Sequence, residues 1–102
     1  MRPFISEKIR DVLNQDYSLN VYKIIGSLVE FDKTYVAFVY WKTDRELNMI
    51  TDDIKRKIKH IFLNYLKNNG YFPNEVQDVI LYFDSDENVQ KNYKGNYFYA
   101  TR

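Results

Sequence analysis

The segment Thr34–Lys42, which reads TYVAFVYWK, constrains the fold of this chain more than any other. It is rich in β-branched and aromatic residues, which are typical of β-strands. Both faces of such a strand would be apolar, one carrying Tyr35, Ala37, Val39 and Trp41 and the other Val36, Phe38 and Tyr40. A strand that is apolar on both faces is usually buried on both. We therefore predict a central strand with cover on each side.

Two further segments show the spacing of amphipathic helices. The first, Phe4–Gln15, has an apolar stripe, and Ser6 is placed to cap its first turn. The second, Asp44–Asn68, sets an isoleucine-rich stripe against a lysine-rich face. Its start is open between Asp44 and Thr51, because Thr51 precedes two acids that suit a helix N-terminus.

The remaining segments are read as strands and one short helix. Extended structure is predicted for Tyr17–Phe31, with a bulge or bend at Gly26, and for Val76–Asp84. A short helix is predicted for Ser85–Tyr93, followed by a final strand at Asn96–Thr101. The order α-β-β-α-β-(short α)-β predicts an α+β fold, with helices packed on an antiparallel sheet of about four strands. At 102 residues, 1–102 is expected to be a single domain.

Composition and charge narrow the class of protein. The chain has no cysteine, so disulfides and thiolate metal sites are excluded, and a cytoplasmic location is expected. Its N-terminus carries charges throughout and resembles neither a signal peptide nor a membrane span. The net charge of +1 makes a nucleic-acid partner unlikely on sequence grounds, because nucleic-acid binders usually carry a large positive excess.

The sequence contains no residue set typical of catalysis or of a metal site. The run Asp84-x-Asp86-x-Asn88 imitates the start of a calcium loop, but Val89 and Gly95 stand where that loop needs Gly and Glu. The single histidine lacks a second soft ligand, and no serine lies in a glycine elbow. We therefore expect no cofactor, no metal and no enzymatic activity.

The C-terminal region is the candidate contact surface. It combines acids on a turn with tyrosines that follow within a few residues: Asp84, Asp86, Glu87, Tyr93, Tyr97 and Tyr99. Amphipathic rings beside acids are typical of protein-binding patches. If the final strand turns Phe98 inward, Tyr97 and Tyr99 lie on the outer face. In the alternative, Tyr97 and Tyr99 are the buried residues and Phe98 packs under the short helix.

Three segments resemble the small immunity proteins of bacterial polymorphic-toxin and contact-dependent growth inhibition systems. They read YLKNNGY at Tyr65–Tyr71, DSDENV at Asp84–Val89 and GNYFY at Gly95–Tyr99. The resemblance implies a cytoplasmic antidote that binds a cognate protein toxin domain and blocks it. The chain departs from many such antidotes in being near neutral instead of acidic, which leaves the toxin's chemistry open.

Two other functions compete with this interpretation. A small nucleic-acid-associated regulator could use the cationic face of the long helix, formed by Lys55, Arg56, Lys57, Lys59 and Lys67. A small enzyme would have to rely on the scattered carboxylates. Most such cationic faces are simply solvated sides of amphipathic helices, so a protein-binding inhibitor is the preferred prediction. The sequence does not indicate an oligomeric state.

Overall fold

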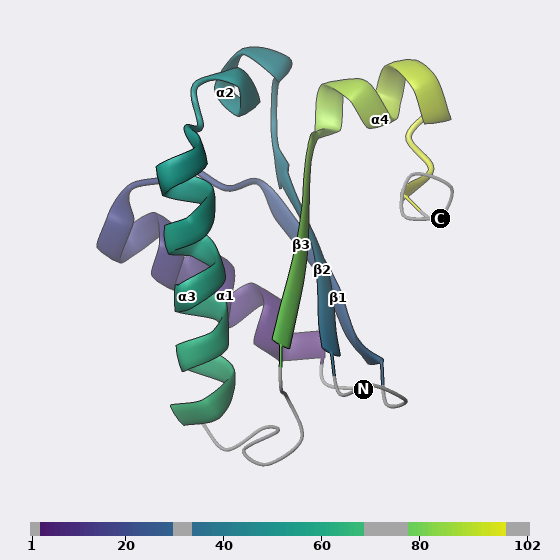
Figure 1. Ribbon diagram of the computed structural model, residues 1–102. Coiled ribbons are helices and arrows are strands. Elements are labelled where there is room, and N and C mark those ends of the chain that lie inside the picture. Colours follow the sequence, from purple (N-terminus) through teal and green to yellow (C-terminus); the bar gives the residue numbers. More distant parts are fainter. Residues whose placement is uncertain (1–2, 30–33, 69–77, 98–102) are drawn as a thin grey trace.

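The computed structural model of this chain describes residues 3–29, 34–68 and 78–97 (Figure 1). Within these ranges the chain forms four helices and three strands, in the order α1 (Pro3–Tyr17), β1 (Lys23–Val29), β2 (Thr34–Trp41), α2 (Asp44–Asn48), α3 (Asp52–Asn68), β3 (Asp78–Ser85) and α4 (Asp86–Tyr93). The α+β class predicted from the sequence is confirmed.

The three strands form one mixed sheet in the order β1-β2-β3. The central position predicted for the strand at Thr34–Lys42 is therefore confirmed. The prediction of an antiparallel sheet is correct for β1 and β2 but wrong for β2 and β3, which run parallel. The reason is the connection between them: α3 carries the chain back along the sheet, so β3 starts from the same end as β2.

The predicted final strand is not found in the described part of the chain. Asn96 has no regular structure and Tyr97 has a helical backbone, whereas the rest of Asn96–Thr101 lies outside the described residues. Gly70, whose sequence context Asn68-Asn69-Gly70 predicts the end of the long helix, also lies outside them. The short helix is confirmed as α4: Ser85 caps its N-terminus, and Lys94 ends it in the left-handed conformation.

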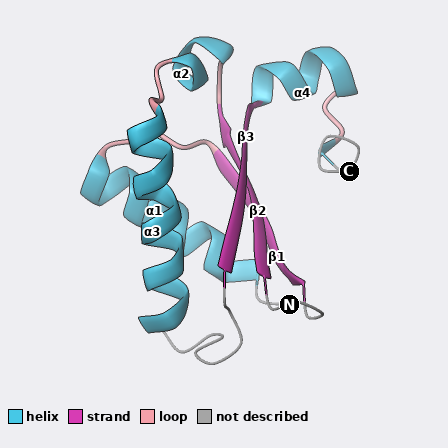
Figure 2. Ribbon diagram, viewed as in Figure 1, coloured by secondary structure: helices cyan, strands magenta, loops and turns pink. Residues whose placement is uncertain are grey.

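α1 and α3 lie on one side of the sheet and enclose the core (Figure 2). The core side of β2 is almost fully buried at Tyr35, Ala37, Val39 and Trp41. Facing it are fully buried residues of the two helices: Ile9 and Leu13 from α1, and Ile58, Phe62 and Leu66 from α3. The indole Nε1 of Trp41 donates to the carbonyl of Leu19 at 2.8 Å, which ties the segment after α1 to the sheet.

Two boundaries differ from those predicted. The long helix is divided into α2 and α3, and both candidate starts are used: Thr43 caps α2, and the Thr51 hydroxyl accepts from the amide of Ile54. The first strand begins at Lys23 instead of Tyr17, because α1 continues to Tyr17 and two left-handed residues follow it. Asn14 then holds Val21 through two side-chain hydrogen bonds of 2.7 and 2.9 Å.

Gly26 does not mark a bulge, since it lies in continuous register with Ala37. Its role is steric. A Cβ at this position would lie 2.5 Å from the Tyr35 hydroxyl oxygen and 2.7 Å from a ring carbon. Glycine therefore makes room for a large buried ring on the neighbouring strand.

Candidate partner-binding surface

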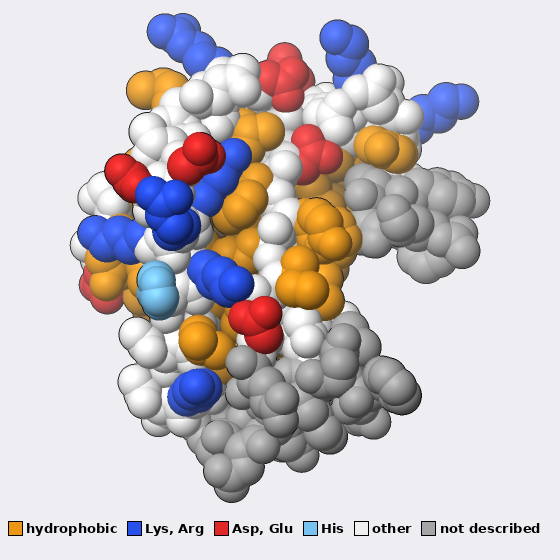
Figure 3. Space-filling view, in the orientation of Figure 1, with side chains coloured by type: hydrophobic (Ala, Val, Ile, Leu, Met, Phe, Trp, Pro, Cys, Tyr) orange, Lys and Arg blue, Asp and Glu red, His pale blue; other side chains and the backbone are white. Residues whose placement is uncertain are grey.

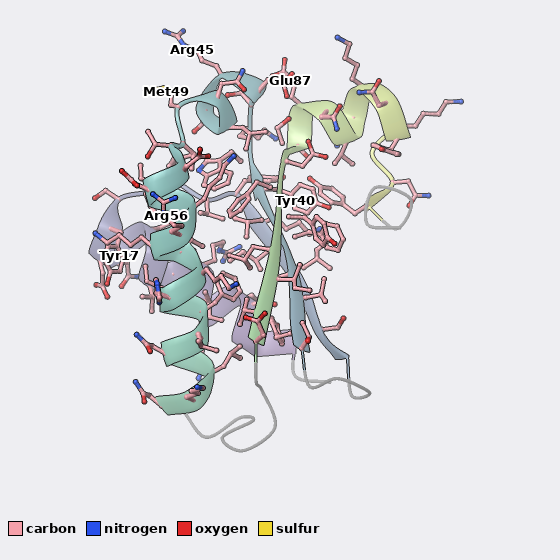
Figure 4. All side chains as sticks on the ribbon, in the orientation of Figure 1. Tyr17, Tyr40, Arg45, Met49, Arg56 and Glu87 are labelled. Carbon is pink, nitrogen blue, oxygen red and sulfur yellow. The ribbon has the colours of Figure 1, made fainter. Side chains whose placement is uncertain are left out.

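The residues at the start of α4 form a network of side-chain hydrogen bonds. The Ser85 hydroxyl accepts from the amide of Asn88 at 3.0 Å and contacts the Asp44 carboxylate of α2. Glu87 is exposed, and it accepts from the Asp44 amide at 2.8 Å. The amide of Glu87 donates to the carbonyl of Lys42, at the end of β2. These contacts fix α4 and α2 at the same end of the sheet, where Figure 4 shows Glu87.

Asp86 is the buried charged group of this network, with only 5% of its surface exposed. Its carboxylate accepts hydrogen bonds from the Tyr97 hydroxyl and, at 3.3 Å, from the side-chain amide of Gln90. It also forms an ion pair with the Lys42 ammonium at 3.3 Å. The hydrogen bond from Tyr97 is the main cause that lowers the pKa of Asp86, and Gln90 and Lys42 act in the same direction. Asp86 is therefore held as a carboxylate despite its burial.

Tyr97 covers one end of the sheet through its ring as well as its hydroxyl. The ring meets Tyr40 edge-on, with centroids 4.9 Å apart and planes at 87°. The Lys23 ammonium lies 4.3 Å from the centroid of the Tyr97 ring. Burial and the Asp86 carboxylate raise the pKa of Tyr97 above its usual value. Tyr97 is half-buried and thus packs within the fold while remaining partly accessible.

Tyr40 lies below α4 in Figure 4 and is fully buried. Its hydroxyl has no hydrogen-bond partner among the described residues. Burial, with smaller effects of Asp84 and Tyr93, raises the pKa of Tyr40 to about 12. A buried hydroxyl without a partner is uncommon and carries a desolvation cost.

The six contact residues predicted from the sequence fall into different environments. Glu87 and Tyr93 are exposed, Tyr93 by 38%. Asp84 is half-buried and accepts from the side-chain amide of Asn88 at 2.9 and 3.0 Å. Asp86 is buried, so the expectation that this acid faces solvent is wrong. Tyr97 is half-buried against Tyr40, and Tyr99 lies outside the described residues.

The opposite side of the sheet from α1 and α3 carries an apolar surface that the sequence prediction assigned to the interior. Among the residues that strand register places on this side, five form what we call the outer sheet face: Ile25, Val36, Phe38, Ile80 and Tyr82. The rings of Phe38 and Tyr82 stack with centroids 5.0 Å apart and planes at 19°. Ile80 is 42% exposed and Tyr82 is 52% exposed.

Figure 3 shows hydrophobic side chains gathered on the side of β3 that faces away from α3. Two acids lie at the ends of the same row of β3: Asp78 comes before Ile80, and Asp84 follows Tyr82. The alternation of Asp78, Ile80, Tyr82 and Asp84 is visible in the sequence. It could have indicated an apolar surface bounded by acids, had β3 been recognised as an edge strand.

The cationic face of α3 is largely engaged with neighbouring groups. Lys59 pairs with Asp78 at 3.4 Å, and Arg56 pairs with Asp53 on the same helix. The ammonium of Lys57 lies 4.9 Å from the ring centroid of Tyr17, and that of Lys55 lies 5.4 Å from that of Phe83. These contacts give four of the five cations a partner inside the molecule.

No group of histidines and carboxylates in the described ranges is arranged to hold a metal ion. Among the same residues, no helix has both the length and the apolar character needed to cross a membrane. Comparisons with protein-family models, curated proteins and solved structures return no match. The outer sheet face is therefore the feature from which a function can be proposed.

Proposed function

We propose that this chain is a small cytoplasmic inhibitor of the immunity type, which neutralises a cognate bacterial toxin domain by binding it directly. The observation that carries the proposal is the outer sheet face. Its exposed side chains, Ile80 and Tyr82, adjoin the half-buried Phe38, so aromatic and aliphatic groups are contiguous. Aromatic residues are enriched at the centres of protein interfaces and carry much of their binding energy.

The surroundings of this face suit a protein partner with basic groups at its rim. Asp78 keeps 58% of its side chain exposed although it pairs with Lys59. Glu87 is exposed at the other end of β3. Rim charges of one sign mainly raise the association rate and set orientation towards a partner of opposite sign. The exposed residues of the C-terminal prediction, Glu87 and Tyr93, thus belong to the rim of the proposed interface.

The alternative is a nucleic-acid-associated regulator that uses the cationic face of α3. It is less well supported, because the chain as a whole carries a net charge of only +1, whereas nucleic-acid binders usually show a large positive excess. Retention on heparin at low salt would favour it, since a phosphate-binding face gives a steep salt dependence. The proposed inhibitor should elute early and at low ionic strength.

The experiment is a growth assay in a bacterial host. The reading frames next to this chain's gene are searched for a large protein, and the C-terminal domain of that protein is expressed from an inducible promoter, with and without this chain. Rescue by the wild-type chain, and its loss for Tyr82→Arg, would support the proposal. A toxic domain that this chain fails to neutralise, although the chain is folded and in excess, would contradict it.

A further inference from the structure

β3 is an edge strand of the sheet. It pairs with β2 along all eight of its residues, and among the described residues no strand pairs with its second edge. In Figure 3 a column of white atoms, the colour shared by the backbone and the remaining side chains, runs between α3 and the hydrophobic patch, at the position that β3 occupies in Figure 1. An open edge of this length is a template for a further strand, and proteins usually blunt such an edge unless they use it.

The side chains of β3 that point away from the core follow a pattern, acid-apolar-apolar-acid, that favours some partner strands over others. Its two apolar members, Ile80 and Tyr82, are the exposed residues of the outer sheet face, so the open edge and the apolar surface are continuous. Asp78 and Asp84 lie at the two ends of this row, and Asp78 keeps 58% of its side chain exposed while it pairs with Lys59 at 3.4 Å. The amide hydrogen bonds that Asp84 accepts from Asn88 leave its negative charge in place.

We propose that β3 binds an extended strand of the partner by β-augmentation, and that this strand presents two apolar side chains between two basic ones. The basic residues would lie opposite Asp78 and Asp84, and the apolar residues opposite Ile80 and Tyr82. Because side chains alternate along a strand, the motif is basic-x-apolar-x-apolar-x-basic, about seven residues long. The motif reads the same in both directions, so it fits parallel and antiparallel pairing. This inference rests on the proposed function only in taking the toxin domain as the source of the strand.

A second copy of this chain is a poorer occupant of the same edge. Antiparallel pairing of two β3 strands about Leu81 would pair Asp78–Asp84 of one copy with the same segment of the other. It would also place Asp78 opposite Asp84 of the other copy, twice. Like charges directly opposite each other destabilise a strand pair. The acids that favour a basic strand therefore oppose self-association in this register, whereas pairing about Tyr82, which is equally long, places Asp84 opposite Ile80.

The test uses a synthetic peptide, so it does not depend on the identity of the toxin. The probe is Lys-Thr-Val-Thr-Val-Thr-Lys with blocked ends, and the control replaces both lysines by glutamate. Backbone amide shifts of the labelled full chain are followed during titration. We expect the lysine peptide to bind with a dissociation constant below about 1 mM and to slow hydrogen exchange in β3. The glutamate peptide should bind about tenfold more weakly, since two attractive contacts become repulsive.

Two N-methylated forms of the lysine peptide separate strand addition from simple side-chain contact. Each form is methylated at alternate residues and so loses hydrogen bonding along one edge only. Strand addition predicts that one form binds and the other does not. Failure of the unmethylated peptide to bind at millimolar concentration, or equal behaviour of the two methylated forms, would overturn the inference.

A charge exchange on the protein completes the test. Asp78→Lys should reduce the ratio between the dissociation constants of the glutamate and lysine peptides. Asp11→Lys, an equal charge change at an exposed position of α1, should leave this ratio unchanged. An equal effect of both variants would count against the proposed register. Failure to neutralise a toxin would contradict the proposed function and leave these peptide results unchanged.

Discussion

The hydroxyl of Tyr97 donates a hydrogen bond to the buried carboxylate of Asp86, eleven residues earlier in the chain. This contact joins the segment after α4 to the first turn of that helix. It also brings the Tyr97 ring against Tyr40 at the end of the outer sheet face. Two residues that the sequence suggested as partner contacts thus bind each other, and the apolar surface beside them is the stronger candidate for recognition.

Replacing Tyr97 by phenylalanine should destabilise the fold. The ring can keep its packing on Tyr40, but Asp86 loses the hydrogen bond that most favours its charged form. Hydrogen bonds to charged groups contribute somewhat more than neutral ones, so we expect a loss of about 1–2 kcal/mol in urea unfolding. Tyr93→Phe, at an exposed tyrosine of α4, is the matched control and should leave stability unchanged. Equal stability of both variants would show that the Tyr97–Asp86 contact is energetically unimportant.

Acid should weaken the fold through Asp86. Its pKa is lowered in the folded protein, so its contribution to stability is present above the unfolded value of about 3.9. That contribution is lost as the pH falls through the lower, folded pKa. The urea midpoints of wild type and Asp86→Asn should therefore differ at pH 7 and converge below about pH 4. A difference that is constant with pH would contradict this role. The pKa of Asp78 is also lowered, but Asp78 is present in both proteins, so its titration cancels in the comparison.

Tyr40→Phe should be neutral or stabilising at pH 7, because it removes a buried hydroxyl that has no described partner. The same substitution should reduce alkaline sensitivity. The pKa of Tyr40 is raised to about 12 in the folded protein, against about 10 in the unfolded chain. The free energy of unfolding is therefore unaffected by this titration below about pH 10, and it falls as the pH rises from about 10 towards 12. Thermal melts from pH 7 to 11.5 measure both effects. A clear loss of stability at pH 7 would mean that the hydroxyl is satisfied.

Gly26→Ala should destabilise the protein by about 1–3 kcal/mol, because overpacking a close contact forces the buried Tyr35 ring to move. Ser27→Ala, at the exposed neighbouring position of β1, is the control and should have little effect. Chemical denaturation of the two variants provides the comparison. If Gly26→Ala is as stable as Ser27→Ala, the close approach of Tyr35 is not the reason for glycine at this position.

Much of the secondary structure could be predicted from sequence, but the sheet topology could not. β2 was identifiable because its two apolar faces are typical of a central strand. The alternation in β3 is the same for a parallel and an antiparallel neighbour, so the sequence did not reveal its direction. The direction depends on how α2 and α3 return the chain, which is a property of the tertiary fold.

The candidate surface was predictable only in part. The pattern drew attention to the residues around α4, where the structure has a network of side-chain hydrogen bonds, yet Asp86 looked like an ordinary exposed acid of a first helical turn. Its burial depends on Tyr97 and Lys42, which are distant in sequence. The outer sheet face was missed because apolar residues on both faces of β2 predict cover on both, and Ile80 and Tyr82 are exposed instead.

The central claim is that the outer sheet face binds a protein partner, and Tyr82→Arg tests it most directly. Met49→Arg is the matched control, since Met49 is 72% exposed and lies next to α2 (Figure 4). Both variants should melt like the wild type.

The measurement is calorimetric titration of each variant with the cognate toxin domain of the proposed function, which is sought in the reading frames next to this chain's gene. We predict that Tyr82→Arg weakens binding by about 2 kcal/mol or more, roughly thirtyfold, while Met49→Arg binds as the wild type does. Wild-type affinity of a folded Tyr82→Arg protein would contradict the claim.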